Sequence, residues 1–173
     1  MEIGSYSGHV RVYQRDLTSS SGWSQLGIDI DGEAAGDCSG YSVAISYSGN
    51  IVAIGARFNN GGGSKSGHTR VYIRDSTSLM GWVQVGNDVD GESRHNESGS
   101  AVALSANGDV LASGAIGNDN DDGSSGHVRV YETCRNVSLI LQTNLVIQYH
   151  FHHSHIHSIV SNGTSASTES LIP

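Results

Sequence analysis

The stretch Ser7–Tyr13 reads Ser-Gly-His-Val-Arg-Val-Tyr, and it returns almost unchanged at Ser66–Tyr72 and Ser125–Tyr131. The histidines of the three phrases follow one another at an interval of 59 residues, as His9, His68 and His127. A fixed period of this length is typical of stacked copies of one supersecondary unit, none of which can bury its apolar face alone. The phrase therefore predicts a repeat architecture.

Working outward from the phrase, residues 9–67 and 68–126 align without gaps, and about half of the positions are identical. Each copy holds four short runs of β-strand composition, separated by turn residues. The predicted strands are His9–Tyr13, Trp23–Ile28, Ser42–Ser46, Ile51–Ala56, His68–Tyr72, Trp82–Asn87, Ala101–Ser105, Val110–Ala115 and His127–Tyr131. No segment shows helical periodicity with caps.

Four antiparallel strands per period predict one blade of a β-propeller. We therefore expect an all-β fold with a partial blade at 1–28, a full blade at 42–87 and a three-stranded blade at 101–131. Closed propellers need roughly four to eight blades, so this chain is expected to be a fragment of a larger propeller or an open stack. An open stack would self-associate through its unpaired blade edges.

The repeat pattern does not continue in residues 132–173. In place of the expected strands, this segment has an apolar run followed by a histidine-rich and Ser/Thr-rich end. We expect this tail to be poorly ordered, since no partner strands are foreseen for it. The tail contains five clustered histidines, His150, His152, His153, His155 and His157. Three of them, His153, His155 and His157, would share one face of a strand, which raises the alternative of transition-metal binding.

Large aromatic side chains recur at matching positions of the copies and are predicted to pack between blades rather than contact a ligand. They are Tyr13, Tyr72, Tyr131, Trp23 and Trp82.

Two further segments resemble the FG-GAP repeats of integrin-α-type propellers: Gly40–Ser46, Gly-Tyr-Ser-Val-Ala-Ile-Ser, and Val52–Ala56, Val-Ala-Ile-Gly-Ala. The resemblance covers Met1–Tyr131. The Phe-Gly of the family motif is here Ser39-Gly40, and its Gly-Ala-Pro is Gly55-Ala56-Arg57. The family often carries an Asp-rich calcium loop in the first hairpin, but the matching turns here have too few carboxylates for the six to eight oxygens that calcium takes.

The net charge of −8 argues against a nucleic-acid or anionic-membrane partner, and no apolar run is long enough for a membrane-spanning helix. No signal peptide is visible after Met1. The two cysteines, Cys38 and Cys134, do not form a disulfide framework. Three N-glycosylation triplets, beginning at Asn96, Asn136 and Asn162, favour an extracellular or cell-surface location only weakly.

Longer loops collect on one predicted face, where binding residues concentrate on rigid scaffolds. Their most regular feature is Asp-x-Asp-Gly-Glu, which supplies six candidate ligand-binding carboxylates: Asp29, Asp31, Glu33, Asp88, Asp90 and Glu92. They could hold a divalent cation or a polar ligand such as a sugar. Alternatively, they shape the turn and pair with neighbouring arginines, namely Arg11, Arg15, Arg70 and Arg74.

A calcium loop is a further candidate at Asn118, Asn120 and Asp122, which alternate before Gly123; the alternative is a solvated loop. The three repeat histidines lie on different predicted blades and are therefore interpreted as satisfied strand residues rather than one metal set. No catalytic constellation is visible.

The sequence thus predicts a non-enzymatic binding module that recognises protein or carbohydrate through its long loops. One alternative is a calcium-dependent structural or adhesive module. Another is an accessory propeller of a larger secreted hydrolase.

Overall fold

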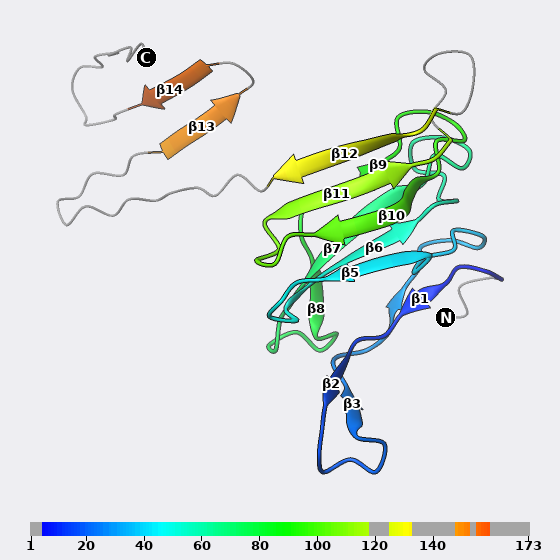
Figure 1. Cartoon of the computed structure of the whole chain (residues 1–173), viewed down its shortest axis with the longest axis vertical. Helices are drawn as coiled ribbons and strands as arrows, with labels where there is room; N and C mark the ends of the chain where they lie inside the picture. Colours follow the sequence, from blue (N-terminus) through cyan, green and yellow to red (C-terminus); the bar gives the residue numbers. More distant parts are fainter. Residues whose placement is uncertain (1–4, 118–124, 133–147, 153–154, 160–173) are drawn as a thin grey trace. The chain divides into compact units, whose positions relative to one another are not determined.

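The computed structural model describes residues 5–117, 125–132, 148–152 and 155–159, and every regular element among them is a β-strand. All the strand pairs are antiparallel, as predicted for an all-β chain. The described strands do not close into a barrel or a propeller (Figure 1). Two compact units are present, residues 1–132 and 133–173. No helix long and apolar enough to cross a membrane occurs in the described part.

The central sheet contains four strands in chain order, β5 (Ser42–Ile45), β6 (Ile51–Ala56), β7 (His68–Arg74) and β8 (Trp82–Gln84). A short strand, β9 (Val89–Asp90), pairs with the beginning of β7. Five of the six β6 residues are buried, which explains why this strand is composed of Val, Ala, Ile and Gly without polar alternation. The four predicted strands of this region are confirmed, although the Trp82 strand ends earlier than expected.

A second sheet has the order β10–β11–β12, formed by Ser98–Leu104, Val110–Ala115 and His127–Glu132. β10 begins before its predicted start, and its pairing with β11 is irregular between Ser98 and Ala101. β10 packs beside β5 and β6, so the two sheets are neighbours (Figure 1).

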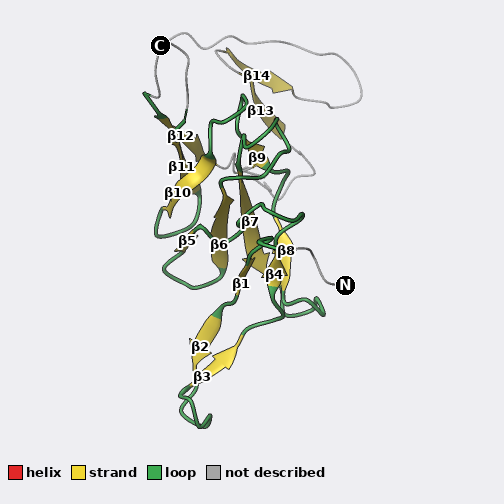
Figure 2. Ribbon diagram, turned by 90° about the vertical axis from the view of Figure 1, so that its right-hand side faces the viewer, coloured by secondary structure: helices red, strands yellow, loops and turns green. Residues whose placement is uncertain are grey.

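The first copy of the repeat departs from the prediction of one strand at residues 9–13. It forms β1 (His9–Val10), which pairs with β4 (Ile30–Asp31), and β2 (Tyr13–Arg15), which pairs with β3 (Trp23–Gln25). In the second copy, β7 stays continuous because β6 supports its other edge along its length. Among the described residues β1 and β2 have no such second neighbour, and the β2–β3 hairpin projects away from β1 and β4 (Figure 2).

The apolar core joins this first copy to the central sheet. It contains Val12, Ile30, Val52, Ile54, Tyr72 and Trp82, with Val10 and Leu26 packed against it. Chain segments from two neighbouring copies therefore bury one another, as expected when a single unit cannot bury its apolar face alone.

The loop between β2 and β3, residues 16–22, is held by hydrogen bonds to Asp16. One carboxylate oxygen accepts the hydroxyl of Ser24, and the other accepts the hydroxyl and the N–H of Thr18, at 2.6 and 2.8 Å. These hydrogen bonds, that from Ser24 first, lower the pKa of Asp16 from 3.8 to about 2.

Acidification is therefore expected to weaken this loop. Because the pKa is lower in the folded state, the unfolded chain binds more protons, so the contribution of Asp16 is complete above about pH 4 and is lost as the pH falls toward 2. Urea unfolding at pH 6 and pH 2.5 should show a smaller acid-induced loss in Asp16→Asn than in the wild type. An equal loss in both proteins would contradict this assignment.

The second unit contains a hairpin of β13 (Gln148–His152) and β14 (His155–Ile159). His150 pairs with His157, and His152 with His155. The expectation that the tail lacks partner strands is thus wrong for these residues, because the two segments pair with each other. The tail residues 133–147, 153–154 and 160–173 lie outside the described part.

Candidate functional site

The carboxylates of the first acidic loop line a cavity of about 370 Å³ between the first copy and the central sheet. Asp29, Asp31 and Glu33 contribute to its wall, together with Arg70 of β7. Apolar side chains complete the lining: Ile28, Ile30, Tyr72, Met80 and Trp82. The cavity therefore combines hydrogen-bond acceptors, a guanidinium donor and an apolar wall.

Part of this acidic loop serves the alternative role of arginine pairing. Asp29 receives two hydrogen bonds from Arg11, at 2.8 and 2.7 Å, and one from Gln25 at 2.9 Å. The Arg11 contact comes first among the causes that lower the pKa of Asp29 to about 2. Because both of its carboxylate oxygens accept hydrogen bonds from Arg11, Asp29 holds the loop in place and is less available to a ligand.

The three carboxylates of the second acidic loop do not converge on one site. Asp88 turns toward His68, Glu92 pairs with Arg129, and Asp90 lies over Gly61, where an added Cβ would come within 2.7 Å of its oxygen. Neither Arg15 nor Arg74 forms an ion pair within the described residues, so arginine pairing is confirmed only in part.

Around Glu33, the structure brings together side chains that the sequence analysis kept apart. Its Oε1 lies 3.5 Å from Nη1 of Arg70, and its Oε2 accepts a hydrogen bond of 3.3 Å from Nδ2 of Asn59. Arg70 also donates from Nη2 to the backbone oxygen of Asp31 at 2.9 Å. Glu33 is thus oriented from two sides while its side chain keeps 47% exposure.

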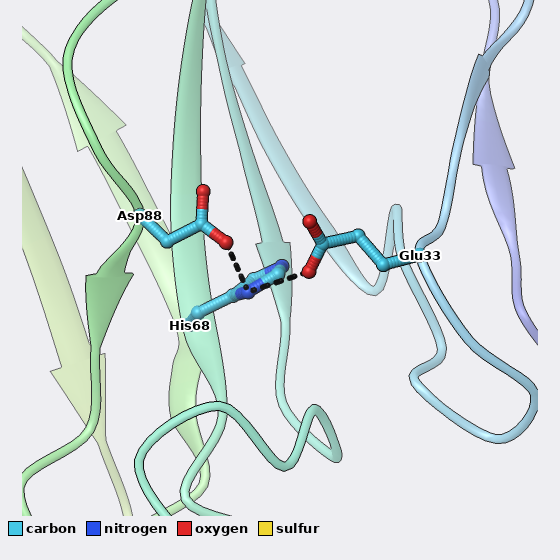
Figure 3. Close-up of side chains that lie close together, drawn as sticks. All are labelled: Glu33, His68 and Asp88. Carbon is cyan, nitrogen blue, oxygen red and sulfur yellow. Dashed lines mark ion pairs between the residues drawn. The ribbon is translucent and has the colours of Figure 1, made fainter.

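His68 begins β7 and is fully buried, with Nδ1 3.3 Å from Oδ2 of Asp88 and 3.8 Å from Oε2 of Glu33 (Figure 3). Neither ring nitrogen has a hydrogen-bond partner of good geometry. Burial lowers the pKa of His68, and Arg70 adds to the effect against the opposing pull of Asp88 and Glu33. The imidazole is therefore neutral near pH 7, with a lone pair on one nitrogen.

The prediction of satisfied strand histidines is wrong for His68, because burial deprives its nitrogens of water and no protein group forms a hydrogen bond with them. The other two repeat histidines differ: His9 is exposed and His127 half-buried. Only His68 belongs to a described cluster whose ligand atoms lie within 4.8 Å of one another, with Glu33 and Asp88. The prediction that the three histidines do not form one metal set is consistent with this arrangement.

The predicted aromatic packing holds for one copy. Tyr72 and Trp82 are buried in the core, whereas Tyr13 and Trp23 are exposed at 48% and 56%, and Tyr131 is 36% exposed. The reason is positional: the first copy covers Trp82, and no described segment covers Trp23.

Sequence reasoning missed Asp37, which is completely buried beside this region. Its Oδ2 accepts hydrogen bonds from Nδ2 of Asn59 at 2.9 Å and from the N–H of Ala34 at 3.0 Å. The available signal was its match to Asn96 one period later, since both are short polar residues and both are buried. Because Asn96 is only 2% exposed, its glycosylation triplet cannot be used by the folded chain and lends no support to secretion.

Other predicted site residues lie outside the part of the chain that the structure describes, or on strands whose side chains it does not describe. Asn118, Asn120 and Asp122 of the proposed calcium loop fall in the undescribed segment 118–124, as does the tail histidine His153 in 153–154. The remaining tail histidines lie on β13 and β14, whose side chains are not described.

No protein-family model matches this chain, and no curated protein matches it in sequence.

Proposed function

We propose that the chain is a non-enzymatic binding module, a segment of an FG-GAP-like β-propeller, that holds a hydroxyl-rich ligand of the carbohydrate class outside the cell. Two observations support the blade interpretation. The central sheet has four antiparallel strands in chain order, and the sheet one period later lies beside it. The first-copy strands pack on the other side, through the shared core.

The single observation that supports ligand binding is the mixed lining of the 370 Å³ cavity, whose size falls within the usual range for ligand pockets. A sugar hydroxyl both donates and accepts hydrogen bonds. Asp31 and Glu33 supply acceptors and Arg70 supplies donors. A cationic peptide would benefit from the carboxylates but would be opposed by Arg70, so a neutral polyol fits the set better.

Binding of neutral oligosaccharides is expected on a glycan array and by calorimetry with the best array ligand. Asp31→Asn should weaken that binding on the order of tenfold, because it removes a charged acceptor from the cavity. Asp90→Asn is the matched control, since Asp90 stands one period later and does not line the cavity. It should bind like the wild type.

Two outcomes would contradict the carbohydrate proposal. One is the absence of any glycan signal, and the other is equal binding by Asp31→Asn and Asp90→Asn. Binding of a Lys-rich peptide in place of glycans would favour protein recognition through the acidic loop.

The edge strand β12 supports a further part of this proposal, self-association. Within the described residues it pairs only with β11, and Val128 and Val130 are 68% and 67% exposed. An exposed apolar edge is a template for pairing with another chain.

A further inference from the structure

We propose that Glu33, His68 and Asp88 form a binding site for a divalent transition-metal ion such as zinc. Both ring nitrogens of His68 are buried and lack hydrogen-bond partners. Leaving a buried polar group unpaired is costly, and such a group in a native protein calls for an explanation. A metal ion bound to Nδ1 would supply the missing interaction, since neutral imidazole is among the commonest metal ligands.

The spacing of the three side chains suits one ion. Ligand atoms about 2.1 Å from a tetrahedral zinc ion lie about 3.4 Å from one another. Nδ1 of His68 lies 3.3 Å from Oδ2 of Asp88 and 3.8 Å from Oε2 of Glu33, and all three atoms fall within 4.8 Å. Small side-chain rotations would therefore bring them to one centre, with a fourth position left for water.

The groups around the site orient the carboxylates in the way that metal ligands require. Gln84 donates to Oδ1 of Asp88 at 2.6 Å, which leaves Oδ2 facing His68. Arg70 lies against Oε1 of Glu33, while Oε2 faces His68 and also accepts the longer bond from Asn59. Partners of this kind fix ligand orientation and tune affinity at metal sites.

The donor set selects the class of metal. One imidazole nitrogen with two carboxylate oxygens suits zinc and its neighbours in the first transition series, whereas calcium prefers six to eight oxygens. The two carboxylates carry two negative charges against the single positive charge of Arg70, so a divalent cation is favoured. Glu33 also lines the neighbouring cavity, so the two sites share this residue, whereas His68 and Asp88 do not line the cavity.

The next pair of copies lacks one member of the set. One period later, Glu92 and His127 are present, but position 147, which corresponds to Asp88, is Ile147. Glu92 pairs with Arg129 there. The chain thus supplies its own controls, because the same residue types stand at matched positions without forming the set.

The test uses the full chain with the five tail histidines replaced by asparagine, so that they do not bind zinc themselves. Calorimetry with zinc chloride alone should show one saturable site per chain. Glu33→Gln and Asp88→Asn should each weaken it on the order of tenfold or more, because each removes a charged ligand. The matched variants Glu92→Gln and Asp29→Asn should bind zinc like the background protein.

X-ray absorption of the zinc-loaded background protein should show nitrogen and oxygen neighbours at about 2.0–2.2 Å, including one imidazole. Calcium chloride should neither bind with comparable affinity nor displace zinc. Both ligand side chains keep part of their surface exposed, 47% for Glu33 and 24% for Asp88, so their isosteric variants should fold. Circular dichroism of each variant checks this.

The proposal is overturned if the background protein shows no saturable zinc binding, or if Glu33→Gln and Asp88→Asn bind as their matched controls do. Failure here is distinguishable from failure of the carbohydrate proposal. Zinc binding is measured without glycan, and Asp31→Asn, which tests the cavity, leaves all three proposed ligands in place.

Discussion

Replacement of Trp82 by alanine is expected to lower the free energy of unfolding by about 3–5 kcal/mol, the usual cost of removing a large buried aromatic side chain. Trp82 is 4% exposed and belongs to the core that joins the first copy to the central sheet. Its indole Nε1 also donates to the backbone oxygen of Leu26 at 2.8 Å, across that interface. The substitution therefore removes packing and a hydrogen bond together.

The matched control is Trp23→Ala, at the same position one period earlier. Trp23 is 56% exposed, so its removal should cost less than about 1 kcal/mol. Urea unfolding followed by far-UV circular dichroism compares both variants with the wild type, and Trp82→Phe separates the lost hydrogen bond from the lost volume. Equal destabilisation by Trp23→Ala and Trp82→Ala would show that the two tryptophans have the same environment, against the structure.

Gly99→Ala should be the second most destabilising change, by about 3 kcal/mol, because two costs combine. Gly99 has φ of +80°, where a residue with Cβ is strained. An added Cβ would also lie 2.2 Å from the backbone oxygen of His68 and 3.0 Å from Cα of Gly55. The backbone of β10 could then no longer approach β6 and β7 as closely.

Gly86→Ala isolates the first of these costs. Gly86 has a similar φ of +70°, but an added Cβ would meet nothing within 4 Å. We expect it to cost about 1 kcal/mol, from backbone strain alone. Thermal or urea unfolding of the two variants measures the difference, and similar losses in both would contradict close contact between the sheets at Gly99.

The strands were largely predictable from the sequence, because short β-branched and small-residue runs alternate with turn residues within a repeated frame. β5, β6 and β7 lie where that pattern places them, and β11 matches its predicted bounds. The break between β1 and β2 was not predictable, since it depends on whether a neighbouring strand supports the second edge. His9–Tyr13 and His68–Tyr72 differ only at Val10 and Thr69, both β-branched, whereas their neighbouring strands differ.

The candidate site was predictable only in its ingredients. The acidic loops identified Glu33 and Asp88 as candidate ligand residues, and the repeated phrase drew attention to His68. The sequence did not predict that these three side chains lie together. These three residues belong to different strands and loops, and a histidine that starts a strand can be solvated or paired. Burial of His68 without a partner is a property of its packing, which no residue type encodes alone.

The sequence by itself determined most of the strand-forming segments and their period. The tertiary structure decided which equivalent residues become different: Trp82 is core and Trp23 is surface, and His68 is buried while His9 is exposed. The physical reason is clearest at Trp82, which is buried against Leu26 and the core residues of the preceding copy, while no described segment covers Trp23. Equal sequence therefore leads to unequal environments wherever the neighbours differ.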